Sequence, residues 1–167
     1  MKTFEQLVAG DTPNIHSILE PDELTMRSVL VASFLNTGSP ISLSALTSHL
    51  EALEIDVHET IKNLTDKGLI VTQDGGMISG LYPFSAVPTR HKVQLNDGRT
   101  FFAMCAIDSL GIAHEMEEGA LITSSCALCN IPITVEILKG KISSSHPQTS
   151  RAVHVALSEY KDWAGTC

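Results

Sequence analysis

The chain has 167 residues, a length that fits one domain or two small ones sharing an interface. Apolar residues make up 43% of it and charged residues 18%, a balance that excludes a disordered protein. The formal net charge of −8 opposes tight, nonspecific binding to phosphate backbones. Since the sequence has neither a run of about 18 apolar residues nor an apolar signal-peptide core, we expect a cytoplasmic protein that does not cross a membrane.

The first half of the chain has mainly helical patterning. Apolar residues at helical spacing predict three helices, at 21–38, 42–53 and 56–68. Ser42 is placed to cap the start of the second helix, and Gly38 and Gly68 to end the first and third. Residues 69–83 read as two strands joined by a turn at Asp74-Gly75-Gly76.

Three helices followed by a two-stranded ribbon are typical of a winged-helix domain, which we assign to residues 1–83. Such domains often bind DNA, so the charge of the third helix matters. Its charged side chains are Asp56, Glu59, Lys62, Asp66 and Lys67. This helix is slightly acidic where a DNA-reading helix should be basic, so we do not expect nucleic acid as a partner. We favour a domain that packs against the rest of the chain.

The second half is assigned to residues 84–167 and begins within a proline-containing linker at 82–90. Its sequence predicts mainly β-structure. Strands are predicted within 91–104, within 119–145 on both sides of a cysteine-bearing turn, and over 151–160. A short helix-like segment between them stops near Gly111. The sequence thus predicts an α+β protein, with a winged-helix-like helical domain followed by a domain built on a mixed or antiparallel β-sheet with short helices.

The segment FFAMCAIDSLG (101–111) places a thiol and a carboxylate three residues apart in an apolar run. On a helix, Cys105 and Asp108 would share one face. A thiol with a pKa of ~8.5 must lose its proton to attack an electrophile or bind a soft metal, and a nearby carboxylate can accept that proton. Burial would raise the Asp108 pKa and let the carboxyl deliver the proton elsewhere. The alternative is that Cys105 fills the core and Asp108 caps a turn.

Cys126 and Cys129 form a Cys-x-x-Cys pair, which can be half of a zinc site or a redox pair. A structural zinc ion needs four ligands, and no second pair at ligand spacing exists to complete the set. A redox motif of the thioredoxin type enters a helix, whereas a strand resumes after this pair. We therefore favour buried, unreactive thiols. All four cysteines lie between residues 105 and 167, so this half is expected to carry the chemistry.

Three segments, in order and at similar spacing, resemble the alkylmercury (organomercurial) lyase family. FFAMCAIDSLG (101–111) is similar to the family's active-site run, in which an aspartate follows a cysteine by three residues. ALITSSCALCNIPITVEI (120–137) resembles its strand, Ser-Ser-x-Cys turn and strand. HPQTSRAVHVALSEYKDWAGTC (146–167) resembles the approach to a second active-site cysteine. The helical first half agrees with the winged-helix-like domain of these proteins.

The resemblance implies protonolysis of an organomercurial, R–Hg⁺ + H⁺ → RH + Hg²⁺. Cys105 would match the thiolate that attacks mercury, Asp108 the group that takes thiol protons and protonates the leaving carbon, and Cys167 the second thiolate. Cys126 would match a structural cysteine. Cys129 is extra relative to the family pattern and is a candidate additional metal ligand. No cofactor is required; Hg(II) or another soft metal is the bound product, and external thiols support turnover.

The implied partners are a small organometallic substrate and small thiols, or a reductase or chaperone that accepts the metal. A dimer is left open. Family members continue past the second cysteine with a further strand and helix, so we expect residues 84–167 to be a domain cut short at its C-terminus. Two alternatives also stay open: a non-catalytic thiolate metal-binding protein, acting as a chaperone or sensor, and a metal-responsive DNA-binding protein.

Overall fold

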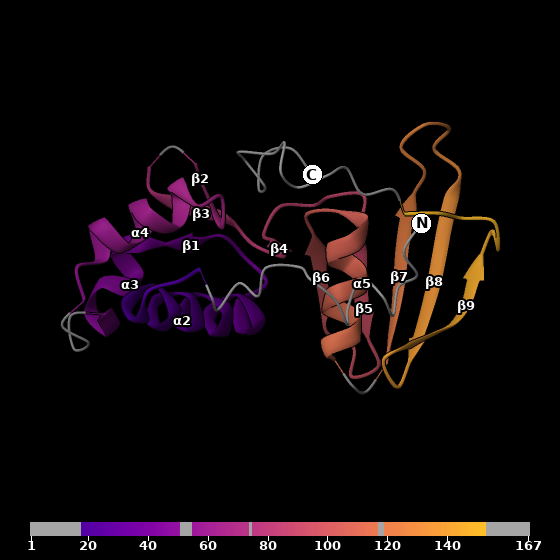
Figure 1. Ribbon diagram of the computed structural model, residues 1–167, viewed down its shortest axis with the longest axis horizontal. Helices are drawn as coiled ribbons and strands as arrows, with labels where there is room; N and C mark the ends of the chain where they lie inside the picture. The colour runs from indigo at the N-terminus through magenta and orange to yellow at the C-terminus, as the bar shows by residue number, and fades with distance from the viewer. Residues whose placement is uncertain (1–17, 51–54, 74, 117–118, 153–167) are drawn as a thin grey trace.

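The fold is α+β, as predicted, and is built on one antiparallel sheet (Figure 1). The computed structural model describes residues 18–50, 55–73, 75–116 and 119–152. The strands in these ranges are β1 (Ile41–Ser42), β2 (Ile70–Gln73), β3 (Met77–Leu81), β4 (Phe84–Ser85), β5 (Lys92–Leu95), β6 (Thr100–Ala103), β7 (Ala120–Ser125), β8 (Pro132–Leu138) and β9 (Lys141–His146). Eight strands follow the order β1-β3-β4-β6-β5-β7-β8-β9, and β2 pairs with β3 off this path.

The helices described are α2 (Pro21–Thr37), α3 (Leu43–Leu50), α4 (Val57–Asp66) and α5 (Ala106–Glu115). The first three confirm the helices predicted in the first half, and their ends follow local capping chemistry. Helix α2 ends at Gly38, whose φ of 59° is a left-handed conformation that glycine adopts without a Cβ penalty. Helix α4 begins after Asp56, whose carboxylate accepts a hydrogen bond from the Glu59 backbone N–H at 3.0 Å.

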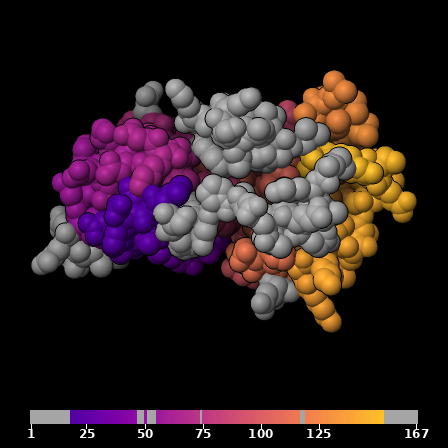
Figure 2. Space-filling model, in the orientation of Figure 1, coloured from indigo at the N-terminus to yellow at the C-terminus, as the bar shows by residue number. Residues whose placement is uncertain are grey.

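The two halves of the chain are joined through the sheet rather than by a free linker. Strand β4 lies inside the predicted linker and pairs with β3 on one side and β6 on the other. The helical part and strands β7–β9 therefore occupy opposite ends of the molecule (Figures 1 and 2). The helices and β1–β3 have the elements of a winged-helix domain, but assignment to that class stays a prediction.

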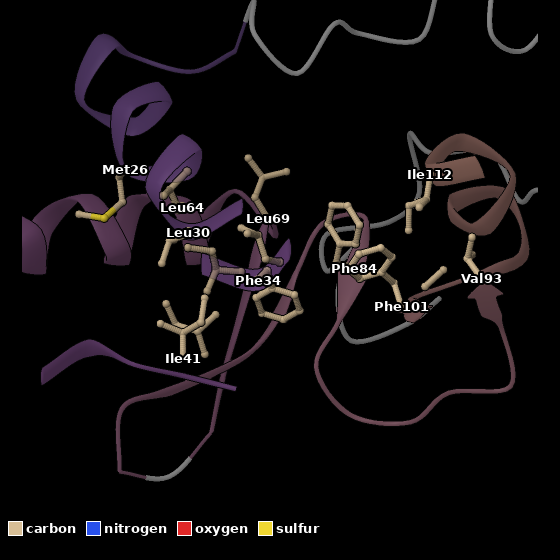
Figure 3. Packing of buried hydrophobic residues seen from close by; sticks show 14 of the residues in the cluster. Met26, Leu30, Phe34, Ile41, Leu64, Leu69, Phe84, Val93, Phe101 and Ile112 are labelled. Atoms are coloured by element: carbon tan, nitrogen blue, oxygen red, sulfur yellow. The ribbon is translucent and has the colours of Figure 1, made fainter. Parts of the chain in front are cut away.

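A continuous apolar core runs across the junction of the halves (Figure 3). Phe84 of β4 lies between Phe34 of α2 and Phe101 of β6, with ring centroids 6.3 Å and 5.8 Å away. Both separations are typical of favourable aromatic pairs. Since the apolar faces of both halves meet in this cluster, the helical part supports the strands that lead to the start of α5.

Two elements of the second half differ from the sequence prediction. Helix α5 does not stop near Gly111 but continues to Glu115, because Ile112 and Ala113 are buried in the core and hold the last turn in place. Residues 119–145 were expected to form two strands, whereas a third, β9, pairs with β8. The strand predicted over 151–160 extends outside the described residues. None of the described helices has the length and apolar character needed to span a membrane.

Substituting Gly80 by alanine is expected to destabilise the junction. A Cβ at Gly80 would lie 2.7 Å from Met104 Cε and 3.1 Å from Val71 Cγ2. The methionine end can move, but the β-branched valine is stiff, so we expect a loss of about 1–3 kcal/mol. Urea unfolding monitored by circular dichroism would measure the loss. Alanine at Gly111, where an added Cβ meets nothing within 4 Å, is the matched control, and equal stability of the two variants would contradict this view of the junction.

Candidate active site

Cys105 and Asp108 meet at the start of helix α5. Cys105 is the N-cap residue, with an extended backbone (φ −140°, ψ 177°), and its sulfur accepts a hydrogen bond from the Asp108 backbone N–H at 3.4 Å. The Asp108 carboxylate accepts one from the Cys105 backbone N–H at 3.1 Å. This is a capping box in which a thiol replaces the usual hydroxyl. The structure thus brings the two side chains together, and the cap fixes the thiol and the carboxyl against each other.

Asp108 has an unusually basic carboxyl for an aspartate. It is buried, with a relative exposure of 4%, and this desolvation raises its pKa from 3.8 to about 6. Hydrogen bonds from the Cys105 side chain and backbone, and from the Tyr82 side chain, oppose that rise by favouring the carboxylate. Near neutral pH the carboxyl can therefore accept a proton and release it again at a small free-energy cost.

The helical half of the protein reaches this site through Tyr82. The Tyr82 side chain hydrogen-bonds to Asp108, and its backbone carbonyl accepts a hydrogen bond from Arg27 Nη2 at 3.0 Å. Arg27 belongs to α2, and burial lowers the pKa of its guanidinium. Its Nε is buried without a hydrogen-bond partner among the described residues. Burying a polar atom without a partner costs free energy, and Arg27 bears this cost while it links α2 to Tyr82, the residue that contacts Asp108.

The strand register brings the turn that holds Cys126 and Cys129 to the same edge of the sheet as Cys105. Phe102 of β6 and Thr123 of β7 both pair with Lys92 of the intervening β5. Cys105 and Cys126 each follow these positions by three residues, and both strands run in the same direction. Their strands are two spacings, or roughly 10 Å, apart. The start of α5 and the β7–β8 turn thus lie toward one edge (Figure 1).

The Cys126–Cys129 pair is not buried, contrary to the sequence prediction. Cys126 is half-buried and Cys129 is exposed, because the β7–β8 turn projects beyond the strands that it joins. The Cys126 sulfur accepts hydrogen bonds from the backbone N–H groups of Cys129 and Leu128, which lower its pKa. The Cys129 thiol and the positive charge of Arg90 act in the same direction. Together, these groups favour the thiolate of Cys126.

No group of three or more histidine, cysteine, aspartate or glutamate side chains suited to a metal ion occurs among the described residues, so zinc ligation by this pair finds no support there. Cys167 lies outside the described residues, and its expected approach to Cys105 stays a prediction.

Comparison with known proteins places the chain in a family. The alkylmercury lyase (MerB) family model matches residues 84–167, half of the chain, including Cys105, Asp108 and the cysteine pair. The chain belongs to the alkylmercury lyase family. A crystal structure of the mercury-bound form of MerB2 is similar, with a TM-score of 0.65 and 25% sequence identity over 86% of this chain. This chain spans 66% of that protein, just under two thirds. No curated protein sequence matches.

Three side chains that contact Asp108 or support the residues near it were not singled out from the sequence. Tyr82 and Arg27 are far from Asp108 in the chain, and no local motif marks them. His91 precedes β5 and lies 2.8 Å from Ser124 Oγ through its Nδ1. Burial, and the nearby charge of Arg90, lower the His91 pKa, so the imidazole is neutral at pH 7.

Proposed function

We propose that this chain cleaves carbon–mercury bonds by protonolysis, with Cys105 as the attacking thiolate and Asp108 as the proton carrier. The observation that carries the proposal is the capping box, which holds the Cys105 thiol at a buried carboxyl whose pKa is about 6. An ordinary surface aspartate would hold its proton too weakly to deliver it to carbon near neutral pH. Membership of the alkylmercury lyase family supports the same reaction.

The proton balance of the proposed reaction is simple. Asp108 takes the proton from the Cys105 thiol, and the thiolate binds the mercury of R–Hg⁺. The second thiolate, assigned to Cys167 by the family resemblance, adds electron density to the metal and makes the carbon more basic. Asp108 then protonates that carbon, RH leaves, and Hg²⁺ stays on the sulfurs. The proton that Cys105 gives up ends on carbon, Cys167 gives its own thiol proton to solvent, and the capping box keeps donor and nucleophile together throughout.

The proposed reaction needs no resident cofactor. Mercury enters with the substrate and remains as the product, which thiolates bind tightly. Turnover therefore requires external small thiols, or a protein that accepts the metal, to remove Hg²⁺. The capacity to bind the metal without cleaving the bond is the competing function, and the exposed thiol of Cys129 is the observation that favours it.

Benzene release from phenylmercury, measured with excess small thiol, tests the proposed function. We expect the protein to release benzene and the Cys105→Ser variant to release none above background, because serine keeps the helix cap but binds mercury poorly. Cys129→Ser, which changes an exposed thiol, is the matched control and should stay active. If phenylmercury binds tightly to the unmodified protein but no benzene forms, the chain is a metal binder and not a lyase.

The variant Tyr82→Phe is expected to raise the Asp108 pKa and slow cleavage just above pH 6. The Tyr82 hydroxyl stabilises the carboxylate, so its removal makes the carboxyl hold its proton to higher pH. A carboxyl that is already protonated cannot accept the thiol proton. The acidic limb of the pH–rate profile should therefore move to higher pH, together with the carboxyl titration followed by ¹³C NMR. A profile and a titration that both stay unchanged would exclude this role for Tyr82.

A further inference from the structure

The turn between β7 and β8 holds two thiols in one short, closed loop. The Cys126 backbone N–H donates to the Ile131 carbonyl at 3.0 Å, and the Asn130 N–H donates to the Cys126 carbonyl at 3.0 Å. Asn130 has a φ of 57°, a conformation that asparagine tolerates better than most residues, and it turns the chain back toward β8. The backbone between the cysteines is therefore fixed by its own hydrogen bonds.

The two sulfurs are close enough to act on one ion. The Cys129 thiol hydrogen-bonds to the Cys126 sulfur, and the Leu128 and Cys129 N–H groups point at the same atom. A metal–sulfur bond is roughly 2.3 Å long, so an ion held between two thiolates needs sulfurs no more than about 4.6 Å apart. Leu128, between the cysteines, is 95% exposed, and Cys129 is exposed too, so an ion can approach from solvent.

The chemistry of the pair selects a particular class of ion. Zinc in a structural site takes four ligands, and no third histidine, cysteine, aspartate or glutamate joins the pair among the described residues. Soft d¹⁰ cations that are stable with two sulfur ligands, Hg(II) foremost, need no more than this turn offers. Arg90, whose charge acts on Cys126, compensates part of the negative charge of two thiolates.

We infer that Cys126 and Cys129 form a second, two-thiolate site for a soft metal cation, distinct from the Cys105–Asp108 site and at the same edge of the sheet. Binding replaces two thiol protons with one ion: 2 RSH + Hg²⁺ → (RS)₂Hg + 2 H⁺. Its use as a first acceptor for Hg²⁺ leaving Cys105 rests on the proposed lyase function. The binding site itself does not, because it needs only the two thiols of the turn.

Mercury binding by cysteine-restricted variants tests this site. The double variant Cys105→Ser/Cys167→Ser keeps only Cys126 and Cys129 of the four cysteines. After equilibrium dialysis of HgCl₂ against excess 2-mercaptoethanol, we expect it to retain one Hg(II) per chain, with sulfur-to-mercury absorption in the ultraviolet. Adding Cys129→Ser should weaken retention on the order of 10²-fold, because the second, intramolecular ligand is lost. Adding Leu128→Ala instead is the matched control and should change nothing.

Two results would overturn the second site: equal mercury retention with and without Cys129, or no retention by the double variant while its circular dichroism matches that of the unmodified protein. Failure here is separable from failure of the lyase function, which benzene release by the unmodified protein decides. In a working lyase, Cys129→Ser should slow repeated turnover at limiting external thiol, where an acceptor for Hg²⁺ matters.

Discussion

Replacing Asp108 by asparagine is expected to lower the rate of carbon–mercury cleavage by about 10²- to 10⁴-fold, the usual contribution of a positioned proton donor. Asparagine has nearly the same shape and can still accept the hydrogen bond from the Cys105 backbone N–H, so the helix cap should persist. It can neither accept the thiol proton nor return it to carbon. Mercury should still bind, because the thiols are untouched. Single-turnover benzene release measures the rate, and equilibrium dialysis measures the binding.

The pH dependence of the same reaction gives a second readout. The carboxylate form of Asp108 must be present to take the Cys105 proton, so the single-turnover rate of the unmodified protein should rise as the pH increases through about 6. Above that range the rate falls again once the pair loses the proton that it shares. The residual rate of Asp108→Asn should lack the limb near pH 6. The control variant Asp97→Asn, in the exposed β5–β6 turn, should behave like the unmodified protein. A near-normal rate in Asp108→Asn would contradict the proposed mechanism.

Local signals in the sequence were enough to predict the helices of the first half and the short helix that follows Cys105. Helix α2 ends at Gly38 and helix α4 begins after Asp56, and both residues act within one helical turn. The three-residue spacing of Cys105 and Asp108 also acts locally, and the structure makes it a capping box. The spacing left open the choice between a cap and a chemical pair. The structure shows the cap, and the chemical pair that the same geometry would supply stays a proposal.

Features that depend on distant contacts could not be predicted in this way. Glycine is a common helix terminator, so the sequence predicts a stop near Gly111. Burial of the next two residues in the core nevertheless lets α5 continue to Glu115. The Tyr82 contact joins segments 26 positions apart, and Arg27 joins the site from another helix. Cysteine is commonly buried, yet the direction of the β7–β8 turn leaves Cys129 in solvent. Each outcome is set by packing that no local pattern encodes.

The same raised pKa makes Asp108 a cost to stability at neutral pH. Its pKa is about 6 in the folded chain against an ordinary 3.8, so between these values the folded state binds more protons than the unfolded state. The stabilising contribution of the protonated carboxyl is thus complete below about pH 4 and is lost as the pH rises through 6. A shift of this size corresponds to about 3 kcal/mol. The proposed proton-carrier role of Asp108 gives the protein a reason to tolerate this cost.

The variant Asp108→Asn should therefore gain stability relative to the unmodified protein as the pH rises. We expect the difference in unfolding free energy, variant minus unmodified, to increase by up to about 3 kcal/mol between pH 4 and pH 7. Urea unfolding at several pH values gives this difference directly. Asp97→Asn provides the opposite sign, because hydrogen bonds from Arg99 lower the Asp97 pKa, although solvent screening keeps that effect small. A difference for Asp108→Asn that does not change with pH would mean that Asp108 titrates normally, and the proton-carrier role would lose its physical basis.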